Sequence, residues 1–409
     1  MSAVDDDLLG RLRDQPRTAR LLDALAGVAG AHLVGGAVRD LLLGGEAVDL
    51  DVVVEGDASA AARTAAERLG GRVREHERFG TATVEAEDLT FDVARARRER
   101  YPAPGALPEV EPASLEDDLL RRDFTVNALA VALGPPTPGA VHGAPRSRED
   151  LDARQLRVFH DDSFRDDPTR LLRLVRYATR LRFAIEPRTD ELARAAVAAG
   201  APATVSGGRI GDELRLLLRE PEPNTALRLA GEIGLDRALH PALAPDPDIA
   251  ERARALLPAN GRGDLVILAA ATRGFDRDAL AAWLDDLEFP AGERDVVVAA
   301  ALGAAALGRR LAAATRPSEI AAAARGHSPE AIVLAAAVVP EAVAGARRWL
   351  DELRHVALDI DGEDVLAAGV PEGPEVGRAL AAALAHKLDG EVAGRDAELA
   401  AALAAIGRE

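Results

Sequence analysis

The sequence predicts an α+β protein: an N-terminal head with a small mixed β-sheet and helices, followed by an all-α neck, body and tail. From residue 31 to about residue 134, short apolar runs of strand length alternate with helical periodicity, and turn residues separate them. After about residue 150 the pattern is almost entirely helical, with Pro and Gly between Ala-rich helices. A chain of 409 residues is also too long for one compact core, so we expect at least two domains.

We divide the chain into four parts on these patterns. Residues 1–30 form a helical lead-in, residues 31–138 the head, residues 150–220 the neck, and residues 221–409 a helical body and tail. A Pro/Gly stretch at residues 134–139 predicts the end of the head. Another Pro-rich segment, residues 101–108, cannot form regular structure and predicts a flexible loop inside the head.

The elements of the head follow from residue types taken in order. Apolar runs predict strands, glycine pairs predict turns and helix ends, and 3.6-residue periodicity predicts helices. The order is a strand, a tight turn, a helix, a second strand, a second helix and two strand-like runs, at residues 31–34, 35–36, 37–43, 48–54, 58–69 and 73–91.

Composition excludes several classes of protein. No apolar run of 18 residues lacks charges, and the N-terminus has neither the basic start nor the apolar stretch of a signal peptide. We therefore expect a cytoplasmic protein with no membrane segment. The absence of cysteine excludes disulfides and thiolate zinc sites, which leaves oxygen-ligated metals as the simplest choice.

Two acids, Asp49 and Asp51, interrupt the otherwise apolar run of residues 48–54. Because side chains alternate along a strand, both carboxylates are expected on one face, with Val48, Leu50 and Val52 on the other. Aspartate is depleted in strands, so this pair predicts divalent-metal ligands of a phosphoryl-transfer site. The alternative is a solvent-facing edge strand.

A glycine turn stands just upstream of the acid pair. Gly35 and Gly36 let backbone approach a ligand, and free N–H groups at a helix start attract anions. Arg39, one turn into the helix, is placed to add a bidentate contact to a triphosphate. Neither the nucleotide-hydrolase loop pattern nor the dinucleotide-binding pattern occurs, which argues against both folds.

Four ordered motifs together resemble the class II tRNA nucleotidyltransferase (CCA-adding) and bacterial poly(A) polymerase family. The first joins the glycine turn to the acid pair. The motifs are GGAVRD at residues 35–40 with DLD at 49–51, FDVARARRERY at 91–101, RRDFTVNALA at 121–130, and SFRDDPTRLLRLVRY at 163–177. The resemblance implies a nucleotidyltransferase head.

The resemblance implies template-independent addition of C and A to the 3′ end of tRNA, with CTP and ATP as substrates. Mg2+ would be bound by the catalytic residues Asp49 and Asp51. Asp92, at the end of a predicted strand, would supply a third carboxylate and is a further candidate ligand. A strand-end aspartate is also often a turn residue or cap. The activity alternatives are addition of A alone, poly(A) synthesis, or a non-catalytic RNA-binding module. No oligomeric state follows from the motifs.

The resemblance also implies a set of nucleotide-binding residues. Arg122 would contact the nucleotide and Asp123 the ribose, whereas Asp167 and Arg170 would present hydrogen-bonding edges to the incoming base. The structural alternatives are helix caps at Asp123 and at Asp167-Pro168. The full set comprises Gly36, Arg39, Arg122, Asp123, Asp167, Arg170, Arg173 and Arg176, of which the last three lie on one predicted basic stripe with Arg180.

Residues 97–110 are similar to the flexible loop of family members that add A. A change from a pyrimidine to a larger purine requires the pocket to change shape, and a Pro-rich loop can act as a semi-rigid lever. The alternative is an ordinary surface connector.

Three further features bear on the function. The net charge of −18 argues against nucleic-acid binding, but residues 91–182 carry 16 Arg against 15 acidic residues, so the acid excess lies elsewhere. The eight histidines lack metal-site spacing, so we expect no appended phosphohydrolase domain. Residues 206–214 match the family pattern Ser-x-Glu-Arg-Ile-x-x-Glu-Leu except for Gly208 in place of Glu, so the local contacts of that segment are expected to differ.

Overall fold

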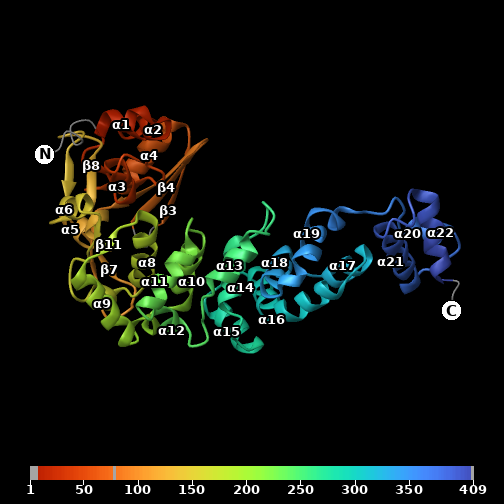
Figure 1. The fold of residues 1–409 in the computed structure, drawn as a ribbon. Coiled ribbons are helices and arrows are strands. Elements are labelled where there is room, and N and C mark those ends of the chain that lie inside the picture. The colour runs from red at the N-terminus through yellow and green to blue at the C-terminus, as the bar shows by residue number, and fades with distance from the viewer. Residues whose placement is uncertain (1–7, 77–79, 407–409) are drawn as a thin grey trace. The chain divides into compact units, whose positions relative to one another are not determined.

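The computed structural model describes residues 8–76 and 80–406 and consists of two compact units (Figure 1). The first unit runs to Ser206 and includes Ile233–Ala238, and the second holds Gly207–Glu232 and the chain from Leu239 onward. The observed division therefore falls at residue 206, whereas the sequence placed the end of the neck at residue 220. The fold class is confirmed, because all strands of the described residues lie in the first unit.

A seven-stranded mixed sheet forms the centre of the first unit. Its strand order is β3-β4-β5-β2-β1-β8-β9; β2 and β5 run parallel, and the other neighbours are antiparallel. The strands are β1 (Ala31–Val34), β2 (Asp51–Val54), β3 (Arg72–His76), β4 (Thr81–Ala86), β5 (Leu89–Arg95), β8 (Leu129–Ala132) and β9 (Val141–Gly143).

One face of this sheet is covered by α4 (Ala58–Leu69), which packs on β3, β4 and β5. Asp57 starts the helix, because its carboxylate accepts a hydrogen bond from the N–H of Ala60, and Gly70 ends it in the left-handed conformation at φ 65°. The face of α4 that packs on the sheet is made of buried alanines, which let the helix approach closely. The helical lead-in, α1 (Leu8–Asp14) and α2 (Pro16–Leu25), is confirmed, and α2 packs on α4.

The opposite face of the sheet carries the acids and is only partly covered. At the β1 and β8 end, Val34, Val53 and Ala130 pack against Leu115 and Leu119 of α5 (Leu115–Leu120). At the β2 and β5 end, Asp51 and Asp92 remain exposed. The covered part fixes the sheet, and the open part leaves room for a ligand.

The strand predictions need three corrections. First, β2 begins at Asp51, so Asp49 lies in the bend before the strand, and Val48 is exposed rather than on the buried face. Second, residues 73–91, in which two strand-like runs were predicted, contain most of β3, all of β4 and the start of β5. Third, the Pro/Gly stretch at residues 134–139 is the connection between β8 and β9, so the head does not end at residue 138.

Further elements complete the first unit. The Pro-rich segment is irregular as predicted, but it joins β6 (Arg97–Arg100) to β7 (Glu109–Pro112) in a hairpin that the sequence analysis missed. The remaining elements are α3 (Gly36–Leu42), η2 (Thr125–Asn127), α6 (Ser147–Asp152), β10 (Gln155–Leu156), α7 (Ser163–Asp166), α8 (Thr169–Leu181), β11 (Ala184–Ile185), α9 (Pro187–Ala198) and η3 (Ala201–Thr204).

The second unit is helical throughout its described residues, as predicted. Its elements are α10 (Gly207–Leu218), α11 (Pro223–Glu232), α13 (Pro247–Arg254), α14 (Gly263–Ala271), α15 (Arg277–Asp286), α16 (Ala291–Ala313), α17 (Pro317–Ala324), α18 (Pro329–Val338), η4 (Pro340–Ala342), α19 (Val343–Asp351), η5 (Leu353–His355), α20 (Gly362–Ala367), α21 (Pro374–Leu388) and α22 (Arg395–Ile406). The helix α12 (Leu235–Leu239) begins in the segment assigned to the first unit. Among the described helices, α16 alone is long and apolar enough to cross a membrane. It packs on α14 and α18, and the core helix of a soluble protein meets the same criterion.

The start of α10 contains the departure from the family pattern. Gly207, Gly208 and Gly211 lie against the turn at the end of α15. A Cβ atom on Gly211 would overlap the carbonyl oxygen of Leu287, whereas one on Gly208 would meet the side chain of Glu288, with its Cδ at 2.5 Å. The family pattern has a glutamate at the position of Gly208. In this protein the carboxylate end of Glu288 occupies the space next to that glycine.

Gly211→Ala is expected to destabilise the second unit by about 1–3 kcal/mol, because a backbone carbonyl cannot move away from the new methyl group without a shift of the turn. Gly208→Ala is the matched control and should cost much less, since the Glu288 side chain can rotate away. Urea unfolding of both variants measures the difference. Equal stabilities of Gly211→Ala and the wild type would contradict the close approach.

Candidate active site

The strand pairing places two carboxylates side by side. β2 and β5 are parallel and pair Asp51 with Asp92, so both side chains leave the same face of strands about 4.8 Å apart. Asp92 was predicted at a strand end, but it lies in the middle of β5, where the hydroxyl of Thr83 donates to its Oδ1 atom at 2.7 Å. This position strengthens its candidacy as a metal ligand.

The acids raise the proton affinity of Asp51. The surrounding protein raises the pKa of the Asp51 carboxyl by burial, Arg122 opposes this, and the negative charges of Asp92 and Asp49 raise the pKa further. Asp51 nevertheless keeps exposed surface. Three acids that repel one another in an accessible place are stabilised by a bound cation.

The donor set fits a hard divalent cation. Carboxylate oxygens suit Mg2+, which keeps several waters and is usually held by one or two protein carboxylates together with substrate phosphates. In the described part of the chain no group of three or more His, Asp or Glu side chains is arranged to hold a metal by itself. The arrangement therefore suits an ion shared between Asp51, its neighbours and a substrate.

The glycine turn brings a guanidinium group close to the acids. Gly35 has φ 75°, and a Cβ atom added to it would lie 2.7 Å from Nη1 of Arg122. Gly36 then begins α3, one residue earlier than the predicted helix start at Ala37. Because Gly35 has no side chain, Arg122 can lie directly on the turn.

Arg122 is the basic residue best placed for a phosphate. It donates to Oδ2 of Asp118 at 3.2 Å, and its charge interacts with Asp51. Its Nε–H is buried and has no acceptor among the described residues. Burial lowers the pKa of this guanidinium, and Asp118 opposes that effect. A partly paired, buried cation beside the acids gains from an anionic ligand.

Arg39 does not have the position that was predicted for a triphosphate contact. The side chain of Arg39 has no exposed surface. It donates to Oδ1 of Asn127 at 2.5 Å, and to Oδ1 and Oδ2 of Asp40 at 2.8 and 3.0 Å. It therefore joins α3 to η2 inside the protein. The sequence placed Arg39 on the correct helix, but it gave no sign that Asn127, far along the chain, binds the Arg39 side chain.

Asp123 connects the segment after α5 to α8. Its carboxylate accepts from the backbone N–H of Phe124, from Asn127, and from Nη2 of Arg173 at 2.6 Å. Burial raises its pKa, but Arg173 and the hydrogen bond from Asn127 outweigh that effect and lower the pKa to about 2. This stabilisation is present above about pH 4 and is lost as the pH falls toward 2. The ribose contact of Asp123 stays a prediction.

The arginines of the predicted basic stripe lie on α8, but they differ in their exposure to solvent. Arg170 and Arg176 are buried. Arg173, Arg176 and Arg180 surround the ring of Tyr177, with guanidinium carbons 4.8–5.6 Å from its centroid. The apolar residues of α8 are also buried, among them Leu171, Leu172, Val175 and Ala178. Stacking on Tyr177 holds these cations in place.

Asp167 is separated from α8 by Pro168, because the helix begins at Thr169, one residue later than predicted. Its Oδ1 atom accepts from the backbone N–H of Thr169 at 3.1 Å and from its hydroxyl at 2.6 Å. Asp167 therefore contacts the first residue of α8, but the N-cap residue of that helix is Pro168, so the predicted helix cap at Asp167 is wrong. Its role in reading a base stays a prediction.

The tip of the β6–β7 connection is anchored. The N–H of Gly105 donates to the carbonyl oxygens of Arg165 and Asp166, both at 3.2 Å. A Cβ atom on Gly105, which has φ 70°, would overlap Thr204. The segment predicted as a flexible loop thus contacts α7 and η3 in this conformation.

Comparisons with known proteins agree with this geometry. The family described as the poly A polymerase head domain matches residues 31–157. The CC-adding tRNA nucleotidyltransferase of Deinococcus radiodurans is 34% identical over 411 residues, which cover 96% of this chain and 95% of that protein. The A-adding tRNA nucleotidyltransferase of Geobacter sulfurreducens is 35% identical over 418 residues. That match covers 96% of this chain but 47% of the relative, so the chain spans about half the length of that curated relative.

Solved structures extend the likeness to the whole chain. A CCA-adding enzyme in its apo form II has a TM-score of 0.82 at 28% identity, with 97% of this chain and 98% of that chain covered. The Thermotoga maritima CCA-adding enzyme complexed with tRNA has a TM-score of 0.78 at 28% identity, with the same shares covered. With the paired acids, the glycine turn and a relative matched over nearly its full length, this chain belongs to the tRNA nucleotidyltransferase and poly(A) polymerase family.

Proposed function

We propose that this protein adds C and A nucleotides to the 3′ end of tRNA without a nucleic-acid template. The observation that carries the proposal is the pairing of Asp51 with Asp92 on one open face of the sheet, next to Arg122 and the glycine turn. Acids that bind a cation and a cation that binds phosphate are the two requirements of nucleotidyl transfer. A non-catalytic RNA-binding module would need cations that bind phosphate, but it would not need the paired acids.

The residues have separate parts in the proposed reaction. Asp51, with Asp49 and Asp92, would hold Mg2+, which when bound activates the attacking 3′-hydroxyl and neutralises the triphosphate. Arg122 would bind triphosphate oxygens, because its buried Nε–H lacks an acceptor among the described residues. The ion pair of Asp123 and Arg173 would hold α8 against the segment that carries Arg122.

Base selection is assigned to Asp167 and Arg170 in this proposal. A carboxylate accepts from the exocyclic amino group that cytosine and adenine share, whereas uracil and guanine present an acceptor at that place. Both residues lie at the start of α8, and Arg170 is held by a hydrogen bond from its Nη2 atom to the carbonyl oxygen of Arg121 at 2.9 Å.

The proposed partners are the tRNA 3′ end, CTP and ATP, and the proposed location is the cytoplasm. A solved CCA-adding enzyme neighbour is complexed with tRNA, and others are complexed with ATP and with CTP. The even balance of basic and acidic residues in residues 91–182 leaves this region suited to a polyanion despite the net charge of −18.

Addition of A alone is the second candidate function. The observation that favours it is the likeness to relatives named A-adding, among them one of Halalkalibacterium halodurans that is 45% identical over 210 residues. These residues cover 51% of this chain and 49% of that relative. The relative named CC-adding, which matches over nearly its full length, argues against a simple transfer of the A-adding name.

One experiment tests the proposed function and separates the candidates. The purified protein is incubated with CTP, ATP and Mg2+ on tRNA transcripts that lack the last one, two or three nucleotides. We expect the missing nucleotides to be restored on all three. Extension of the transcript ending in CC, with no C added to the other two, would instead establish addition of A alone, and extension of none would refute both.

Asp167→Ala is expected to reduce discrimination between CTP and UTP more than it reduces triphosphate binding. Loss of a buried hydrogen bond costs about 1–3 kcal/mol, which corresponds to roughly 5- to 150-fold in selectivity. The measurement is kcat/KM for each nucleotide. If Asp167 serves only to order the start of α8, the variant should lose about 1 kcal/mol of stability with unchanged selectivity.

A further inference from the structure

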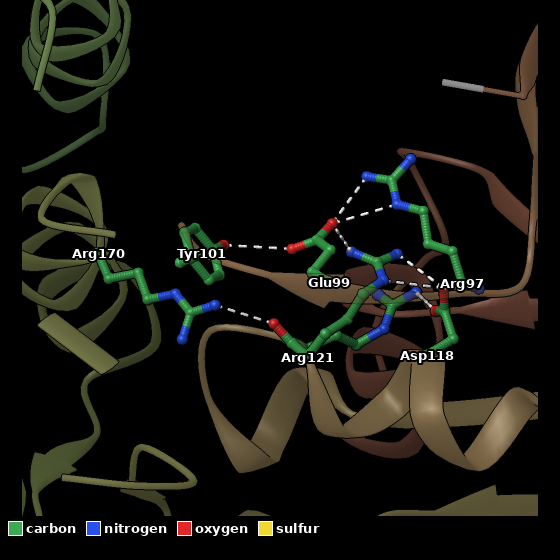
Figure 2. Close-up of polar contacts among 7 residues, drawn as sticks. Arg97, Glu99, Tyr101, Asp118, Arg121 and Arg170 are labelled. Atoms are coloured by element: carbon green, nitrogen blue, oxygen red, sulfur yellow. Dashed lines mark hydrogen bonds and ion pairs between the residues drawn. The ribbon is translucent and has the colours of Figure 1, made fainter. Parts of the chain in front are cut away.

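One side of the β6–β7 hairpin is built around a single carboxylate, Glu99. Side chains alternate along β6, so Arg97, Glu99 and Tyr101 share one side and Arg98 and Arg100 the other. The Glu99 side chain is only 8% exposed. Its Oε1 atom accepts from Arg97 at 2.9 Å and from Arg121 at 3.1 Å, and its Oε2 atom accepts from the hydroxyl of Tyr101 at 3.2 Å (Figure 2).

From Glu99 a continuous set of contacts leads toward the acids of the sheet. Arg121 binds Glu99 with one side of its guanidinium group and Oδ1 of Asp118 with the other, at 2.8 Å. Asp118 is fully buried, and its Oδ2 atom accepts from Arg122 at 3.2 Å. Arg122 in turn lies on the Gly35 turn and interacts with Asp51. The position of Glu99 is thus transmitted to the proposed phosphate-binding residue through two bonded side chains.

A second set of contacts leads from Glu99 toward the proposed base-reading residue. The hydroxyl of Tyr101 donates to Glu99, the charge of Arg170 acts on that hydroxyl, and Arg170 donates to the backbone of Arg121 (Figure 2). Burial raises the pKa of Tyr101 to about 12, so its hydroxyl stays protonated and can donate to Glu99. A cavity of about 330 Å³ is lined by these side chains, with Glu99, Tyr101, Arg121, His160, Asp166 and Arg170 among them.

We propose that Glu99 is a positioning residue that fixes Arg121 and Tyr101 together, and thereby sets both the phosphate-binding Arg122 and the base-reading Arg170. This inference rests on the proposed function and extends it to a residue that does not itself touch the substrate. Two acids, Glu99 and Asp118, hold Arg97, Arg121 and Arg122. Loss of the Glu99 charge leaves Asp118 as the sole anion of this network, so Arg121 would compete more strongly with Arg122 for it.

The test compares Glu99→Gln with a matched control, Glu111→Gln. Glu111 lies on the same hairpin, opposite Arg98 on β7, and is exposed. We expect Glu99→Gln to lower kcat/KM for both CTP and ATP by roughly 5- to 150-fold, mainly through KM, because a buried charged partner is lost. Glu111→Gln should behave as the wild type. Wild-type nucleotide kinetics in Glu99→Gln, even with a lowered melting temperature, would overturn the proposal and leave Glu99 a structural residue.

A second variant and a binding measurement keep the test decisive. Tyr101→Phe removes one hydroxyl, retains all charges of the network and is expected to fold. It should reduce selectivity between ATP and UTP with little effect on triphosphate affinity, and unchanged selectivity would refute the branch toward Arg170. Titration of CTP and ATP into each protein without tRNA should show weaker binding to Glu99→Gln alone. This binding comparison decides the role of Glu99 even if the wild type adds nothing to tRNA, a result that would count against the proposed function only.

Discussion

Asp51→Ala is expected to abolish nucleotide addition while the protein stays folded. The carboxylate lies on the open part of the sheet face, so its removal opens no core cavity. A metal ion at a reacting phosphate contributes several kcal/mol of transition-state stabilisation, so loss of its ligand should lower kcat by about a thousand-fold or more. Asp49→Ala should act in the same direction, and chelation of divalent cations should reproduce the loss. The measurements are incorporation of labelled nucleotide and thermal unfolding.

Asp88→Ala is the matched control for this variant. Asp88 lies between β4 and β5 of the same sheet, is exposed, and pairs with Arg20 on the surface. It should retain full activity. Near-wild-type addition by Asp51→Ala would contradict the metal assignment.

Because the pKa of Asp51 is raised, protons compete with Mg2+ up to a higher pH than at an ordinary aspartate, whose pKa is about 3.9. The Mg2+ affinity should therefore rise as the pH increases through that raised pKa.

Deletion of Pro102–Leu107 is expected to stop synthesis after two C residues. The deletion leaves Tyr101 and Pro108 between β6 and β7, a connection of two residues that is short enough for a hairpin. It removes Gly105, which anchors the tip to Arg165 and Asp166 just before α8. A change of pocket shape from pyrimidine to purine that depends on this connection would then fail. The measurement is the product length on a tRNA lacking all three terminal nucleotides.

Gly105→Ala serves as the control for the deletion. It retains the length of the connection, but its methyl group would overlap Thr204, so it disturbs only the anchored tip. We expect an intermediate loss of A addition and normal C addition. Complete CCA synthesis by the deletion variant would refute a role of the connection in adding A, and loss of C addition as well would point to a general collapse of the hairpin.

The sequence by itself determined the features that depend on neighbouring residues. The strand, glycine turn and helix at residues 31–42, the helix at residues 58–69 and the helical second half were all predicted, because apolar periodicity and glycine act over a few residues. The acid pair was identified because two aspartates interrupt an apolar run, and the resemblance of the motifs to a known family pointed to most of the basic residues. The β6–β7 hairpin was not predicted, because its two strands are short and flank a Pro-rich connection, although Arg97, Glu99 and Tyr101 follow a two-residue alternation.

The tertiary structure decided which of these polar residues face a ligand and which hold the protein together. Asp92 became a neighbour of Asp51 only through parallel strand pairing across 41 positions. Arg39 is covered by Asn127, 88 residues away, and Asp123 is bonded to Arg173, 50 residues away. No local pattern encodes such contacts, because the free energy of burying a charge depends on the partners that folding brings to it. The arginines of different motifs therefore acquire different roles. Arg39 joins two elements inside the protein, whereas Arg122 lies beside the acids.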